Sequence, residues 1–379
     1  MDQVDENRER QRKAREYARQ RRLLFFLQLS LAIAYLLAFV FGGLSLRLRV
    51  LLAPALQHPA LLLAGFFLVL FLVYELVSLP LSVYGGYVLP HRYDLSLQSL
   101  SDWAADAAKG SALSLAFGLV VVEAVYWLMN ALPDWWWLAA GAIIVALDIV
   151  LAFVGPVLLM PLFYRLKPLH DQELASSLED MAARAGARVR GVYVIEFSRK
   201  TRAANAALTG LGRTRRIVLG DTLLDSFTRR ETEAVFAHEL GHHVHADIVR
   251  LLTLQAGLVL ASLYLIWRVL PIVGPELGLA QPADVAGLPL LALMLAAFGL
   301  VTMPLANAFS RWLENAADEY ALRATDDPAA FRSAMAKLAD QNLAEREPPA
   351  WVVYTLYDHP AIGQRLRHAE RYSALRSRR

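Results

Sequence analysis

The chain has 379 residues, of which 56% are hydrophobic and 19% are charged, and its formal net charge at pH 7 is +3. This balance is typical of a membrane protein and argues against a soluble enzyme of the same length. The sequence contains no cysteine. Disulfide bonds and thiolate metal ligands are therefore excluded, and any metal site must use histidine and carboxylate side chains.

The first 22 residues form an arm that is rich in arginine and directly precedes an apolar segment. Such an arm favours a cytoplasmic amino terminus in contact with anionic lipid. A nucleic-acid-binding tail is the weaker alternative because the arm adjoins a membrane helix, so no nucleic-acid partner is expected. A cleaved signal peptide is disfavoured, since the charged arm is too long and no clear small-residue cleavage site follows the apolar run.

Six segments are long and apolar enough to cross a bilayer as helices. They are about Leu23–Phe41, Ala60–Tyr87, Ser111–Leu132, Trp135–Tyr164, Leu251–Leu270 and Gly287–Phe309. The segment Pro271–Ala286 carries no lysine or arginine, whereas Arg165–Arg250 and the carboxyl-terminal tail are rich in arginine. Positive loops stay in the cytoplasm, so both termini and the segment after the fourth span are predicted there. Arg47 and Arg49, on the opposite side, are a mild exception.

The spans divide the chain into five predicted parts. These are a basic cytoplasmic arm (1–22), a four-helix membrane domain (23–164), a first catalytic lobe (165–250), a transmembrane hairpin (251–309) and a second catalytic lobe (310–379).

The first lobe has a mixed pattern of helices and strands. Gln172–Ala185 reads as an amphipathic helix, whereas Val189–Glu196 and Arg216–Leu219 have the β-branched alternation of strands. Thr228 followed three residues later by Glu231 fits a capping box at the start of a further helix.

That helix carries His238-Glu239-Leu240-Gly241-His242, which has the pattern His-Glu-x-x-His. Residues four apart share one face of a helix, so both imidazoles can bind one metal ion. Zinc accepts such nitrogen ligands and keeps a position open for water, from which Glu239 can remove a proton. A solvated helix end with incidental histidines is the alternative.

A catalytic zinc needs a third protein ligand. The short pattern with a third histidine fails, because Ile248 stands where that histidine would be. Glu314 is the best candidate, since the hairpin crosses the membrane twice and returns it to the side of His238. Asp318, one turn further, can accept a proton from a ligand imidazole. Asp247 is a weaker rival, and Glu276 would lie on the wrong side.

Several ordered motifs accompany these residues. They are His91-Arg92-Tyr93-Asp94-Leu95-Ser96 with Trp103, Asp106 and Lys109, then Ser198-Arg199, Asn205-Ala206, Thr209-Gly210-Leu211-Gly212, Arg216-Ile217-Val218-Leu219, Glu314-x-x-x-Asp318 and His359-Pro360 with Arg365. In these motifs, from about His91 to Arg371, the chain resembles the type I CAAX prenyl proteases, which are integral-membrane zinc metalloproteases with bacterial relatives.

The resemblance implies one zinc ion per chain, bound by His238, His242 and Glu314, with Glu239 as general base. It implies a mainly α fold, with a polytopic bundle of about six or seven spans and a gluzincin-like α+β protease domain on the cytoplasmic side. By analogy with the bacterial relatives, the protein is expected in the bacterial inner membrane.

The resemblance also implies residues that contact the substrate. Asn205 and Ala206 would lie at the edge strand that pairs with the substrate backbone, and His359 and Arg365 would stabilise the developing oxyanion. Two features depart from the family: Ala207 and Leu208 replace its usual aromatic residues, and eukaryotic members have seven spans, the missing one being near the amino terminus.

The sequence thus predicts a membrane zinc endopeptidase whose partners are the lipid bilayer and a peptide or protein substrate, prenylated or membrane-bound. An HtpX-like quality-control protease that degrades misfolded membrane proteins is the alternative. A metal-regulated transporter would suit the intramembrane acids Glu75, Glu123 and Asp148, but no paired repeats or broken helices support it. A catalytically inactive scaffold is disfavoured by the intact Glu239.

Overall fold

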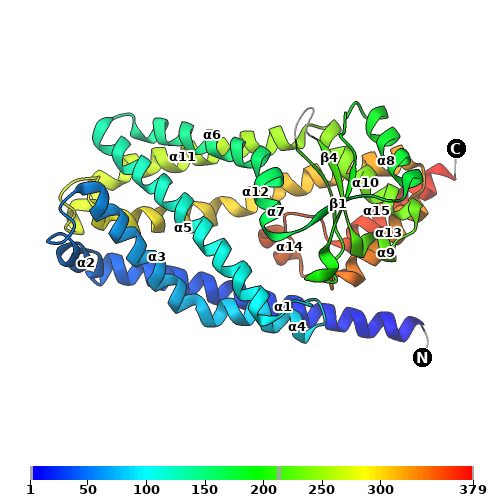
Figure 1. The fold of residues 1–379 in the computed structure, drawn as a ribbon, viewed down its shortest axis with the longest axis horizontal. Helices are drawn as coiled ribbons and strands as arrows, with labels where there is room; N and C mark the ends of the chain where they lie inside the picture. The colour runs from blue at the N-terminus through cyan, green and yellow to red at the C-terminus, as the bar shows by residue number, and fades with distance from the viewer. Residues whose placement is uncertain (1–2, 211–214, 378–379) are drawn as a thin grey trace.

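The computed structural model describes residues 3–210 and 215–377, so Leu211 and Gly212 of the Thr209–Gly212 motif lie outside the described residues. The molecule is elongated, with long helices at one end and a domain containing a small sheet at the other (Figure 1). The long helices are α1 (Gln3–Phe41), α3 (Pro59–Val83), α5 (Leu100–Ala131), α6 (Trp136–Val154), α11 (Asp247–Glu276) and α12 (Leu288–Thr325). The prediction of a mainly α membrane bundle with a mixed domain is confirmed.

Within the described chain, six helical segments are long and apolar enough to span a membrane, as the sequence predicted. Two of them continue beyond α3 and α6 through short π-helical turns, at Tyr84–Val88 and Gly155–Leu159, into α4 (Leu89–Arg92) and α7 (Met160–Phe163). Apolar side chains on their outer faces are exposed, as at Val301, which is 80% exposed. Lipid would cover such side chains in a bilayer.

The short helix α2 (Leu44–Leu52) lies between the first two spans, at the end of the bundle remote from the sheet (Figure 1). Arg49 on α2 forms an ion pair with Asp284, whose side chain is 5% exposed. Arg47 and Arg49 are the two arginines on the side that the charge rule predicts to be non-cytoplasmic, and this contact neutralises Arg49.

The basic arm is part of a helix rather than a separate segment, because α1 runs without interruption from Gln3 to Phe41. Arg10 Nε donates to the carbonyl of Asp340 at 2.7 Å, and Arg22 pairs with Glu345 at 2.8 Å. Asp340 belongs to α13 (Pro328–Gln341) of the mixed domain. Part of the predicted lipid-binding arm therefore holds the mixed domain against the membrane bundle.

The sheet has four strands in the order β1-β2-β4-β3. They are β1 (Leu166–Pro168), β2 (Val192–Ile195), β3 (Ala206–Thr209) and β4 (Arg216–Gly220). β2 and β4 are parallel, whereas β1 and β3 pair antiparallel to their neighbours. The two predicted strands are confirmed as β2 and β4, and β3 is left at one edge of the sheet.

Helices pack around this sheet and enclose the core of the domain. They are α8 (Gln172–Arg184), α9 (Asp221–Ser226), α10 (Arg229–Val244), α13 and α15 (Ile362–Arg376), whereas α14 (Ala350–Leu356) packs against α12. Ile217 and Leu219 alternate along β4 and are fully buried with Phe236 of α10 and Phe331 of α13. Burial of such side chains contributes about 1.5–3 kcal/mol each, which fixes α10 against the sheet.

The predicted capping box begins α10. Glu231 N–H donates to Thr228 Oγ1 at 3.4 Å, and Thr228 N–H donates to Glu231 Oε2 at 2.7 Å. Ser333 and Lys337 of α13 also donate to the Glu231 carboxylate, at 2.5 and 2.7 Å. Burial raises the pKa of Glu231, but these hydrogen bonds outweigh it and lower the pKa to about 2.

The motif that begins at His91 joins the membrane helices to the segment before β3. His91 contacts the carbonyl oxygens of Tyr87 and Gln98 at 2.7 and 2.9 Å, which shapes the turn after α4. The following residues pair with 200–202 through backbone hydrogen bonds, including Leu97 N–H to Lys200 O at 3.0 Å. Asp106 of α5 forms an ion pair with Lys200, so this motif fixes the approach to the edge strand.

Candidate metal centre

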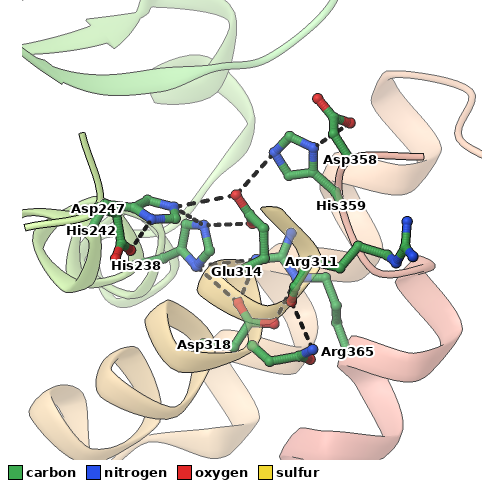
Figure 2. Close-up of polar contacts among 10 residues, drawn as sticks. His238, His242, Asp247, Arg311, Glu314, Asp318, Asp358, His359 and Arg365 are labelled. Carbon is green, nitrogen blue, oxygen red and sulfur yellow. Dashed lines mark hydrogen bonds and ion pairs between the residues drawn. The ribbon is translucent and has the colours of Figure 1, made fainter. Parts of the chain in front are cut away.

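Two helices cross at small residues to form the site. A methyl group on Gly241 of α10 would come within 2.8 Å of the Ala317 Cα atom on α12. Only glycine permits this approach. The crossing brings the His238–His242 face of α10 against the Glu314 face of α12 (Figure 2).

His238, His242 and Glu314 converge on one point. Each offers a ligand atom within 4.8 Å of the other two. The two Nε2 atoms are 3.2 Å apart, and each lies 3.3 Å from a carboxylate oxygen of Glu314. The structure therefore brings the three predicted ligands together in a geometry that a single ion can bridge.

Each histidine has a carboxylate behind it. His238 Nδ1 lies 2.9 Å from Asp318 Oδ1, and His242 Nδ1 lies 2.9 Å from Asp247 Oδ2. Protons on Nδ1 leave both Nε2 lone pairs directed at the shared point, as in many metal sites. Asp318 lies where the sequence placed it, whereas the position of Asp247 behind His242 was missed. The chain turns at Ala246, which has φ 54°, and this reversal brings Asp247 back towards His242.

A divalent metal ion fits these groups. Glu314 Oε2 is buried, and with the His238 proton on Nδ1 it faces only the lone pair of Nε2 at 3.3 Å, which is costly for a carboxylate oxygen. Two imidazole lone pairs also face each other across 3.2 Å. A cation between these three side chains would satisfy all of them, and the imidazole and carboxylate set suits zinc.

Arg365 lies behind the ligands, and its residue is 8% exposed. Its Nε and Nη2 atoms donate to the two oxygens of Asp318 at 2.8 and 2.5 Å. This bidentate contact fixes the carboxylate that holds His238. The oxyanion role that the resemblance implies for Arg365 stays a prediction, because the guanidinium here contacts Asp318.

His359 approaches the centre from the loop after α14. Its Nε2 atom lies 3.2 Å from Glu314 Oε1, and its Nδ1 atom lies 2.8 Å from Asp358 Oδ1. Arg311 lies one turn before Glu314 on the same helix (Figure 2). It donates to the carbonyls of Val353 and Tyr357 and so holds this loop. Sequence reasoning missed Arg311, although its spacing of three residues from Glu314 places both near one helical face.

Glu239 stands apart from these contacts. Its carboxylate makes no hydrogen bond or ion pair within the described chain, and it lines a cavity together with His238. Burial raises the pKa of Glu239, which suits a group that must take up a proton. Burial and Arg365 lower the pKa of His238, but the carboxylates of Asp318 and Glu314 outweigh them and raise it to about 9. A cation bound at the shared point would displace the proton from Nε2, because metal ligands must be deprotonated.

The cavity has a volume of about 840 Å³ and extends from the centre to the edge strand. Asn205 and Ala206 line it, as does His359 on another side. Asn205 directly precedes β3 and is exposed, and β3 has a free edge in the sheet. The residues expected to contact substrate thus surround one space beside the three ligand side chains.

Comparison with known families agrees with this geometry. Residues 168–373 match the model of peptidase family M48, and residues 4–165 match a model described as the CAAX prenyl protease N-terminal region with five membrane helices. The chain belongs to peptidase family M48. In the region with five described membrane helices, this M48 member has four helices of spanning length and the nine-residue α2.

Individual relatives agree with that assignment. The "Uncharacterized metalloprotease YhfN" of Bacillus subtilis is 32% identical over 94% of this chain and 85% of its own length. CAAX prenyl protease 1 of Saccharomyces cerevisiae is 34% identical over 46% of this chain and 39% of its own length. The crystal structure of S. mikatae Ste24p has a TM-score of 0.85 at 24% identity, with 96% of this chain and 89% of that chain covered. The last similarity concerns the fold.

Family and structure together establish a multi-pass integral membrane metalloprotease of the CAAX prenyl protease type. Membership of the M48 family implies a catalytic metal ion, a peptide substrate and contact with the lipid bilayer.

Proposed function

We propose that this protein is a zinc endopeptidase that hydrolyses peptide bonds at the cytoplasmic face of the membrane, in the manner of a CAAX prenyl protease. The convergence of His238, His242 and Glu314 beside an open edge strand carries the proposal. One zinc ion per chain would be held by these three side chains. Zinc bound there would polarise the scissile carbonyl and acidify the attacking water.

The other residues of the site have complementary roles. Glu239 removes a proton from the attacking water and returns it to the leaving amine. Its lack of other partners and its raised pKa support this role. Asp318 and Asp247 keep the two imidazoles in the tautomer that presents Nε2 to the ion. Arg365 positions Asp318 and adds positive charge close to the developing oxyanion.

Substrate is held on the other side of the cavity. The free edge of β3, preceded by Asn205, pairs with an extended peptide backbone through main-chain hydrogen bonds. His359 donates a hydrogen bond to the scissile carbonyl oxygen as negative charge develops. Its position 3.2 Å from Glu314 supports this assignment.

The preferred substrate is a prenylated carboxyl-terminal tail. Apolar side chains line the cavity at Phe25, Met303 and Leu356, where a lipid chain can be held. The name of the yeast relative agrees with this substrate class. An HtpX-like quality-control protease remains the alternative, because the same cavity would accept an unprenylated peptide.

The orientation follows from charge. The arginine-rich part of α1 lies on the side of the catalytic domain (Figure 1), so we place this domain in the cytoplasm and the protein in the bacterial inner membrane. The relative from Bacillus subtilis supports a bacterial setting.

The test uses purified, zinc-loaded protein, a farnesylated CAAX peptide and its unprenylated twin, with products identified by mass spectrometry. We expect cleavage of the farnesylated peptide and a rate at least roughly a hundredfold lower for Glu239→Gln, with its zinc retained. Equal Glu239-dependent cleavage of both peptides would favour the quality-control alternative. Cleavage by Glu239→Gln at the wild-type rate would refute the catalytic assignment.

A further inference from the structure

One of the positively charged side chains that line the cavity has no ion-pair partner among the described residues. Arg21 of α1 lines the cavity that holds His238 and Glu239, and it is exposed. Two other guanidinium groups line this cavity: Arg22 is paired with Glu345, and Arg365 is paired with Asp318. Within the described part of the chain, Arg21 forms no ion pair. Arg21 is therefore a cation beside this space that no carboxylate of the described residues neutralises through an ion pair.

Arg21 is held in place by aromatic packing. Its guanidinium lies 5.9 Å from the centroid of the Tyr17 ring, and Tyr17 packs against Tyr93 with a centroid distance of 5.2 Å. Tyr17 is 9% exposed. Because the supporting ring is buried and packed, the positive charge is presented from a fixed wall.

The direction of the edge strand relates this charge to one end of the substrate. Arg21 also lines a neighbouring cavity with Thr201 and Ala203, so it lies beside the segment that leads into β3. A peptide that adds antiparallel to β3 has its carboxyl end pointing towards the start of β3. Residues after the scissile bond would then run past Asn205 towards Arg21.

From this geometry we propose that Arg21 binds the terminal carboxylate of the substrate and selects peptides that end shortly after the scissile bond. A guanidinium matches a carboxylate in shape and charge. The inference rests on the proposed function and deepens it, because it makes the free carboxyl end a determinant of specificity. Arg21 is a specificity residue, distinct from the groups that act at the reacting bond.

The experiment compares the full-length, zinc-loaded protein on one peptide sequence with either a free carboxyl end or a carboxyl-terminal amide. The variants are Arg21→Gln, Arg21→Lys and, as a matched control on the same helix, Arg19→Gln. Arg19 is exposed and lines neither of these two cavities. Initial rates give KM and kcat for each pair.

We expect wild type and Arg19→Gln to cleave the free acid with a KM roughly tenfold below that of the amide. Arg21→Gln should lose this preference through a higher KM for the acid, with kcat and cleavage of the amide unchanged. Arg21→Lys should keep part of it.

Equal KM values for acid and amide in the wild type, or a preference retained by Arg21→Gln, would overturn the role of Arg21 while Glu239-dependent cleavage still supported the proposed function. Absence of Glu239-dependent cleavage of either peptide would overturn both. If Arg21 contacts only lipid phosphate, the wild type should have equal KM values for the acid and the amide, which would likewise overturn this role.

Discussion

The ligand side and the substrate side of the metal centre differ in how their polar groups are partnered. On the ligand side, His238 and His242 each have a carboxylate behind them, and Asp318 is held by Arg365. On the substrate side, Glu239 makes no hydrogen bond within the described chain, and Arg21 makes no ion pair there. Paired groups fix geometry, whereas unpaired groups keep the capacity to bind substrate and exchange protons.

Because their polar groups are partnered differently, the two sides should respond differently to substitution. Changes on the ligand side should alter metal affinity or folding, since each side chain supports another. Changes on the substrate side should alter turnover or specificity and leave the metal in place. The following predictions test this division, from the largest expected effect to the smallest.

The largest effect is expected from Glu314→Ala, which removes a ligand and leaves two imidazoles. Metal content should fall from about one zinc per chain to nearly none, and peptide cleavage should be lost with it. Glu319→Ala is the matched control, because Glu319 lies on the same helix and pairs with Arg323 and His368 outside the centre. Full zinc retention by Glu314→Ala, measured by plasma mass spectrometry, would exclude Glu314 as a required ligand.

The two supporting carboxylates should rank in a definite order. Asp318→Asn should weaken zinc binding by roughly 10–100-fold, and Asp247→Asn by less. The His242 side chain is 27% exposed and that of His238 is 9% exposed, so solvent screens the Asp247 contact more. Competition with a chelator measures the zinc affinity of both variants. Thermal unfolding of Asp318→Asn shows separately whether leaving Arg365 unpaired destabilises the fold. An equal loss of zinc affinity in the two variants, or a larger loss for Asp247→Asn, would show that burial of the histidine does not set the strength of this effect.

A smaller effect is expected from Glu231→Gln, which keeps an oxygen for the capping box but removes the charge that pairs with Lys337. It should destabilise the catalytic domain by about 1–2 kcal/mol at pH 7 and leave turnover per bound zinc unchanged. The folded-state pKa of about 2 lies below the ordinary 4.5. The wild-type advantage is thus complete above pH 4.5 and is lost as pH falls towards 2. Thermal unfolding in detergent across this range checks it, and a pH-independent difference would contradict the ionic account.

The sequence was most informative where local rules decide the structure. The i, i+4 spacing of His238 and His242 requires only a helix, and the Thr228–Glu231 pair starts that helix. The six spans follow from apolar length, which a bilayer imposes. Glu314 could be reached by counting membrane crossings.

The parts that sequence reasoning missed depend on tertiary packing. Asp247 lies behind His242 because the chain reverses at Ala246, a residue with a positive φ that no sequence pattern announced. The arm was expected on lipid, but Arg10 and Arg22 bind residues more than 300 positions away. Such contacts form between two surfaces that are far apart in the sequence, and the residue spacing within one segment does not predict which surfaces pack together.

The most direct test of the account is an anomalous difference map at the zinc absorption edge from crystals of the zinc-loaded protein. We predict a single strong peak about 2.0–2.2 Å from the Nε2 atoms of His238 and His242 and from a Glu314 oxygen. A map without that peak, or with zinc bound only at Asp247 or His359, would contradict the metal centre on which the proposed mechanism depends.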